Sequence, residues 1–90
     1  MYNFKFKIDE KGRGFCNDIV NVMVDNFQIT KEEAVGRINE HWSNTEIVGE
    51  YCMVYHELPE FWGYEIYFGS NSRWWARKDD PELKPKPFSL

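Results

Sequence analysis

Long apolar segments are missing from this 90-residue sequence, and cysteine is scarce. The opening stretch MYNFKFKID has neither an apolar run of signal-peptide length nor a small-residue cleavage site, and no later segment has the length of a membrane span. The two cysteines, Cys16 and Cys52, lie far apart and outside any CxxC pattern. We therefore expect a soluble cytoplasmic protein with no membrane contact and two buried free thiols. The two cysteines would form a disulfide only if the chain were secreted.

Recognisable catalytic, nucleotide-binding and metal-binding motifs are also absent from the sequence. The segment HELPE at residues 56–60 matches the start of a zinc-protease helix motif, but the second histidine is missing and Pro59 interrupts the helix that this motif requires. His41, His56 and Cys52 could supply metal ligands, yet a lone histidine near a helix end more often contacts terminal carbonyls or solvent. We expect no metal, no cofactor and no enzymatic activity.

Basic residues are not in excess, because 11 Lys and Arg stand against 15 Asp and Glu, for a net charge of −4. Acidic residues occur in both halves, so general attraction to nucleic acid or anionic lipid is not expected and a basic partner is slightly favoured. The 42% apolar and 18% aromatic content is typical of a globular chain. We expect one domain over residues 1–78, followed by a Pro-rich tail at 79–90 that is extended or disordered.

The N-terminal part of the sequence changes from an alternating to a helical pattern. Phe4, Phe6 and Ile8 alternate with charged residues, which predicts a strand with one buried face. The segment EKGRG at residues 10–14 then predicts a turn. Residues 15–27 place their apolar side chains on one broad arc and predict a largely buried helix, although IVNVMV within them also fits a strand.

A second helix is predicted from a local start signal. Thr30 followed by Glu33 forms a capping box, and the acidic residues of the following turn are favourable at a helix N-terminus. We expect this helix to begin at about Lys31 and its apolar stripe to run as far as Trp42.

The C-terminal part carries three aromatic, alternating runs, YCMVYHEL, GYEIYFG and RWWARK, separated by PEFW and SNS. These runs predict a three-stranded antiparallel meander within residues 51–78. The whole is expected to be an α+β fold, with two helices packed on one face of this small antiparallel sheet and an N-terminal strand as a further candidate member. Pairing Leu58 with Gly63 and Gly69 with Arg73 assigns the strand faces. The inner face, expected to form the core, contains Tyr51, Met53, Tyr55, Tyr64, Ile66, Phe68, Trp74 and Ala76.

The outer face of the predicted sheet is the candidate interface, because Tyr, Trp and Arg are enriched in binding hot spots. Within it, His56, Glu65 and Arg77 form a row that is better explained as a cross-strand charge ladder than as an acid–base site. The N-terminal strand or the tail could instead cover this face. The candidate binding residues are Tyr67, Trp75, Arg73, Arg77, His56 and Glu65.

These observations predict a small protein-interaction module, either a regulator or inhibitor of a protein partner or a homodimer, that acts through the outer face. Two alternatives stay open. Single-stranded nucleic acid could stack on Tyr67, Trp74 and Trp75, although the acidic balance disfavours nucleic acid. An enzyme using His56 and Glu65 would need a pocket that holds both side chains.

Overall fold

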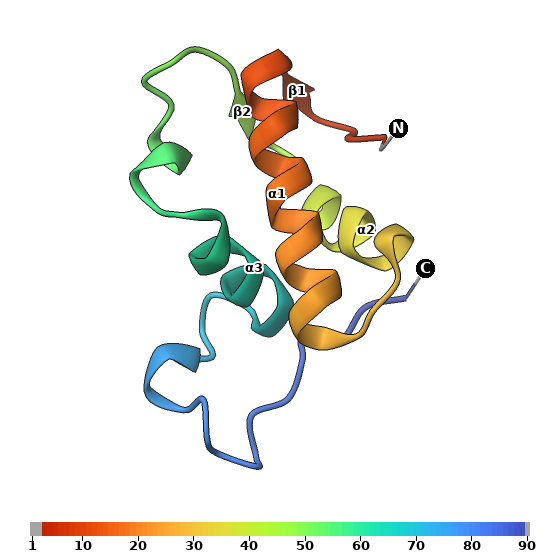
Figure 1. The fold of residues 1–90 in the computed structure, drawn as a ribbon, viewed down its shortest axis with the longest axis vertical. Coiled ribbons are helices and arrows are strands. Elements are labelled where there is room, and N and C mark those ends of the chain that lie inside the picture. Colours follow the sequence, from red (N-terminus) through yellow and green to blue (C-terminus); the bar gives the residue numbers. More distant parts are fainter. Residues whose placement is uncertain (1–2, 90) are drawn as a thin grey trace.

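Residues 3–89 are described by the computed structural model, and three α-helices form the main body of the fold (Figure 1). Helix α1 runs along the molecule, and α2 and α3 both pack against it. A two-stranded parallel sheet and two short 3-10 helices complete the described part. In chain order the elements are β1 (Lys7–Ile8), α1 (Glu10–Phe27), α2 (Lys31–His41), β2 (Glu46–Ile47), η1 (Met53–His56), α3 (Pro59–Phe68) and η2 (Trp74–Ala76).

Helix α1 includes the predicted helix over residues 15–27 but begins earlier than expected. The turn predicted at residues 10–14 is wrong, because Asp9 caps the helix by accepting a hydrogen bond from the Gly12 amide at 2.8 Å. The second Asp9 carboxylate oxygen accepts from the Gly49 amide at 2.8 Å. A Cβ at Gly12 would lie 2.8 Å from the Ile47 carbonyl oxygen. Glycine at this position therefore serves the close approach of β2 to the helix.

The predicted start of α2 is confirmed. The Thr30 hydroxyl accepts a hydrogen bond from the Glu33 amide at 3.0 Å, and the helix begins at Lys31. The Glu33 carboxylate accepts from Arg37 Nε at 2.8 Å, one turn further along the helix. Thr30 therefore caps the helix, while the Glu33 side chain pairs with the buried Arg37.

The N-terminal strand exists but is shorter than predicted and has a different partner. Strands β1 and β2 pair in parallel, with Lys7 opposite Glu46 and Ile8 opposite Ile47. Phe4 and Phe6 are buried, as their alternation predicted. The strand therefore joins residues 46–47 rather than a C-terminal sheet.

The predicted antiparallel meander is wrong, and with it the α+β fold. Residues 51–78 contain η1, α3 and η2 in place of three strands. Pro59 occupies the first position of α3, where its missing N–H costs nothing, and Gly69 ends the helix with a φ of 96° that favours glycine. Gly63 faces α1, where an added Cβ would lie 2.7 Å from Val22 Cγ1. Of the three aromatic runs, GYEIYFG therefore lies on α3, whereas YCMVYHEL and RWWARK lie on the 3-10 helices and the loops around them.

The core face predicted for the meander is correct only in part. Ile66 and Trp74 are buried as expected, whereas Tyr51 and Met53 are 91% and 77% exposed. Val54, which the strand alternation between Met53 and Tyr55 would place on the outer face, is buried instead. The buried apolar cluster consists of Phe4, Phe6, Cys16, Ile19, Val20, Met23, Ala34, Ile38, Trp42, Ile47, Val54 and Ile66.

The segment after η2 has no regular secondary structure as far as residue 89, and it runs back toward α2 (Figure 1). The Lys86 amide donates to the Tyr67 carbonyl at 2.8 Å, and the Lys86 carbonyl accepts from Arg37 Nη1 at 2.8 Å. The Phe88 ring centroid lies 5.2 Å from the Arg37 guanidinium. The end of the described chain is therefore fastened to α2 and α3.

Candidate interaction surface

The residues predicted for the interface lie on different elements and do not form one face. His56 ends η1 and is exposed. Glu65 lies on α3, where its Oε1 accepts a hydrogen bond from Trp74 Nε1 at 2.8 Å. Arg77 follows η2 and donates from Nε to Asp80 Oδ2 at 3.1 Å. The His56–Glu65–Arg77 row depended on the meander and is not formed in the described structure.

The two rings assigned to the outer face have opposite environments. Tyr67 stacks on Phe27 of α1, with centroids 3.9 Å and planes 5° apart, and the Arg37 guanidinium lies 4.8 Å from its centroid. Trp75 is 56% exposed, and Arg73 beside it is exposed with a left-handed backbone, φ 54°. Tyr67 is therefore a packing residue, and the Arg73–Trp75 end of the predicted interface faces solvent.

An exposed apolar segment connects β2 to α3. We call residues 48–58 the apolar loop; in Figure 1 it is the green segment that leaves the helical body on the left. Five large apolar side chains are exposed within residues 3–89, and four of them belong to this loop. The sequence prediction missed two of these because it placed Tyr51 and Met53 in the core. The four are Val48, Tyr51, Met53 and Leu58.

Two anchors hold the apolar loop against the body. Val54 is buried, and its carbonyl accepts a hydrogen bond from Trp62 Nε1 at 2.8 Å. Tyr55 packs edge-on against Phe15 of α1 at 5.0 Å between centroids, and the Lys11 ammonium lies 4.6 Å from the Tyr55 centroid. Desolvation raises the pKa of the Tyr55 phenol, whose oxygen is buried and has no hydrogen-bond partner among the described residues. The contacts of Val54 and Tyr55 therefore fix the loop in a conformation in which the apolar side chains beside them are exposed to solvent.

A hollow of about 230 Å³ adjoins the loop between α3 and η2, and we call it the aromatic groove. The Tyr64 and Trp74 centroids lie 5.1 Å apart, and the Phe61 and Trp74 centroids 5.6 Å apart. The Lys78 ammonium lies 4.7 Å from the Tyr64 centroid and 5.4 Å from that of Trp74. The residues lining the groove are Glu57, Leu58, Glu60, Phe61, Tyr64, Trp74 and Lys78.

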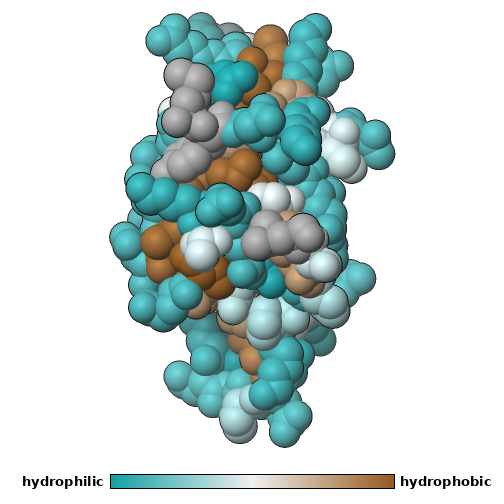
Figure 2. Space-filling model, turned by 90° about the vertical axis from the view of Figure 1, so that its right-hand side faces the viewer, coloured by the Kyte–Doolittle hydropathy of each residue, from teal (hydrophilic) through white to brown (hydrophobic). Residues whose placement is uncertain are grey.

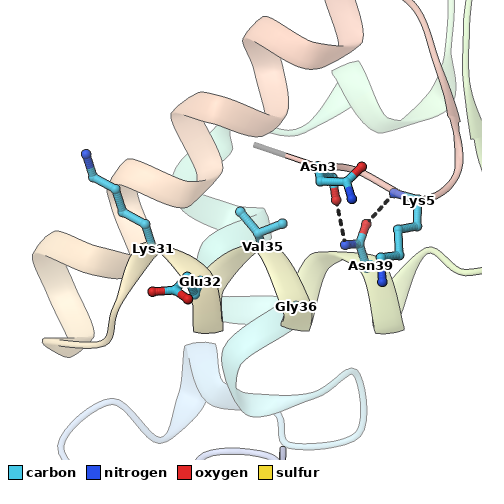
Figure 3. Close-up of a pocket in the computed structure, with 7 residues that line it drawn as sticks. All are labelled: Asn3, Lys5, Lys31, Glu32, Val35, Gly36 and Asn39. Carbon is cyan, nitrogen blue, oxygen red and sulfur yellow. Dashed lines mark hydrogen bonds between the residues drawn. The ribbon is translucent and has the colours of Figure 1, made fainter. Parts of the chain in front are cut away.

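A larger polar groove of about 510 Å³ lies between α2 and the N-terminal segment (Figure 3). Asn39 Nδ2 donates to the Asn3 carbonyl at 3.0 Å, and Asn39 Oδ1 accepts from the Lys5 amide at 2.7 Å. Lys31 and Lys5 lie at opposite ends of the groove, with Val35 between them (Figure 3). The lining residues, among which there is no Ser, Thr, Cys or His, are Asn3, Lys5, Lys31, Glu32, Val35, Gly36 and Asn39.

The face that carries α2 shows hydrophobic surface only as separate patches among hydrophilic side chains (Figure 2). The apolar loop lies at the opposite side of the molecule in Figure 1. The exposed apolar side chains are therefore gathered away from the polar groove.

Burial favours the neutral forms of Cys16 and His41. Burial raises the pKa of the Cys16 thiol to about 12, so this thiol stays protonated. Burial lowers the pKa of His41, which packs edge-on between the rings of Trp42 and Trp62. Among residues 3–89, no group of three His, Cys, Asp or Glu side chains is placed to hold a metal ion.

Comparisons of the chain with known protein families, curated proteins and solved structures found no match. None of the helices within residues 3–89 is both long and apolar enough to cross a membrane. A functional assignment therefore has to come from the apolar loop and the aromatic groove.

Proposed function

We propose that this chain is a protein-interaction module that binds a basic protein partner through the apolar loop. The observation that carries the proposal is the concentration of exposed side chains in residues 48–58, with Tyr51 at 91%, Met53 at 77% and Leu58 at 70% exposure. Exposed apolar patches on small domains mark interaction sites, and aromatic and Met side chains are enriched in interfaces. The anchored backbone supports this role because it limits the entropy lost on binding.

The charge of the loop favours a basic partner over a second copy of the chain. Residues 48–58 include Glu50 and Glu57 but no Lys or Arg, and Glu60 follows on α3. A two-fold dimer formed through this loop would bring the same acidic residues together, because each copy presents the same patch. Lys or Arg side chains on a partner would instead pair with them.

Photo-crosslinking from the loop tests the proposal. Benzoylphenylalanine in place of Tyr51, in the protein's own host, is expected to form an adduct with one basic protein, while the same residue in place of Lys84 in the tail is the matched control. Binding of that purified protein is then measured by calorimetry. The double variant Tyr51→Ser with Met53→Ser is expected to bind roughly tenfold more weakly or worse, because exposed aromatic anchors dominate binding energy.

Three outcomes would overturn the proposal. Adducts of equal yield from positions 51 and 84 would show that the loop is not the contact. An adduct of twice the chain mass, with no other protein captured, would assign the loop to self-association. Unchanged affinity in the double variant, with its helical circular dichroism intact, would remove Tyr51 and Met53 from the interface.

A further inference from the structure

The aromatic groove has a fixed wall of rings. Phe61 and Tyr64 are three residues apart on α3 and therefore project from the same side of that helix. Trp74 of η2 lies against both of them. Its indole is buried and donates to Glu65 Oε1 at 2.8 Å, which sets the orientation of the ring. The three rings thus keep their arrangement without a ligand.

An ammonium group already occupies this wall. The Lys78 Nζ atom lies over the Tyr64 and Trp74 rings, at 4.7 Å and 5.4 Å from their centroids. Both distances are within the range of a cation–π interaction. Lys78 is exposed and forms no ion pair with the other residues between 3 and 89. The cation–π contacts with Tyr64 and Trp74 are therefore the interactions that hold the Lys78 ammonium at this position.

The rest of the groove is complementary to a cation. Glu57 and Glu60 line the hollow, and neither is engaged in an ion pair within the described chain. Leu58, exposed at 70%, adds an apolar surface on which the methylene stem of a long side chain can lie. The lining thus provides ring faces for a charge, carboxylates for its N–H groups and a hydrocarbon strip for its stem.

We infer that the aromatic groove receives a lysine side chain of the basic partner, and that Lys78 is an internal occupant which the incoming ammonium displaces. The inference rests on the proposed function, because it names the chemistry by which the partner is anchored next to the apolar loop. Lysine is favoured over arginine because the group seated on the rings is an ammonium. Displacing Lys78 leaves Trp74 in place, since Glu65 holds the indole independently.

A titration with a single capped amino acid tests this inference without any partner. N-acetyl-lysine methylamide is added at constant ionic strength to the full chain, and the indole N–H signal of Trp74 is followed by NMR. The Lys78→Ala variant is expected to bind this probe about threefold more tightly than the wild-type chain, as follows if Lys78 occupies the groove for about two-thirds of the time. Lys84→Ala removes the same charge from the tail and is expected to leave the affinity unchanged.

Two further comparisons separate cation recognition from simple apolar contact. N-acetyl-norleucine methylamide has a hydrocarbon side chain without the charge and is expected not to shift the Trp74 signal at the same concentrations. Tyr64→Leu and Glu60→Gln, each in the Lys78→Ala background and checked for intact helical circular dichroism, are expected to weaken lysine binding. Equal binding of the two probes, or equal affinity of Lys78→Ala and Lys84→Ala, would overturn the inference.

The titration and the crosslinking experiment test the groove and the loop independently. A negative titration overturns the lysine site and leaves an adduct at position 51 as evidence for the loop. A positive titration together with no adduct at position 51 supports an ammonium-binding groove and overturns the loop as the protein interface.

Discussion

Two glycines of α1 are expected to respond in opposite directions to the same substitution. In Gly12→Ala the new Cβ would lie 2.8 Å from the Ile47 carbonyl oxygen and 2.8 Å from Ile8 Cγ1. Neither the strand backbone nor a packed isoleucine can withdraw freely, so overpacking is expected to cost about 1–3 kcal/mol. The better helix propensity of alanine returns roughly 0.5–1 kcal/mol. The free energy of unfolding should therefore fall by about 0–2.5 kcal/mol, with a central value of about 1 kcal/mol.

Gly14 is the matched control, two residues along the same helix. Gly14 is exposed, and apart from the adjacent residues and the nearby helix backbone no heavy atom lies within 4 Å of an added Cβ. Gly14→Ala should therefore raise the free energy of unfolding by about 0.5–1 kcal/mol. The two variants should then differ by about 2 kcal/mol, or about 8–16 °C in melting temperature for a domain of this size. Chemical and thermal denaturation followed by circular dichroism measure both quantities. If Gly12→Ala is as stable as Gly14→Ala, the parallel strands do not press on the start of α1.

Three further predictions test burial elsewhere. Arg37→Met should lower stability by roughly 2–3 kcal/mol and, by removing the bond to the Lys86 carbonyl and the contact with the Phe88 ring, speed chymotrypsin cleavage after Phe88; unchanged cleavage would contradict tail docking. Burial lowers the pKa of His41 from its usual 6.5, so the unfolded chain binds more protons below that pH and stability should be lost as pH falls through it; His41→Gln should flatten this dependence in denaturant titrations. Cys52 should react with a thiol reagent in the folded protein, and Cys16, with a pKa of about 12, only after unfolding.

The helix at Lys31 could be predicted because its signal is local. The Thr30 hydroxyl needs only the Glu33 amide three residues away, so the same four residues specify the start whatever the rest of the chain does. The start of α1 has a cap of the same local kind, because the Asp9 carboxylate accepts from the Gly12 amide three residues away, but the two glycines of EKGRG favoured a turn in the prediction. What the local pattern could not show is why Gly12 is a glycine, since Ile47, which lies too close for a side chain there, is 35 positions later.

The strands predicted at residues 51–78 failed although a contrary signal was present. Pro59 begins the ten-residue helix α3 and Gly69 follows its last residue, which is the order typical of a helix start and end. The aromatic and β-branched composition between them favours strands, but strand preference depends strongly on packing context. Gly63 favours the helix here, because its missing side chain lets α3 approach Val22 of α1 closely. Helix packing therefore overrode the composition.

The candidate sites depended on this single choice between helix and strand. On a strand, Tyr64 and Trp74 would share a core face with Tyr51, and Trp75 would lie beside Tyr67 on the other side. As a helix, α3 instead turns Tyr67 inward onto α1 and directs Phe61 and Tyr64 toward Trp74.

Because α3 is a helix and not a strand, the residues before it have no sheet to join, and the Tyr51 side chain is exposed to solvent. Apolar side chains that a small core cannot take up remain exposed next to the groove, in a segment without Lys or Arg. The apolar loop and the aromatic groove therefore both depend on the close contact of α3 with α1 at Gly63. A bulky substitution at Gly63 should accordingly disturb partner binding and lysine binding together, whereas Tyr51→Ser should affect only the first.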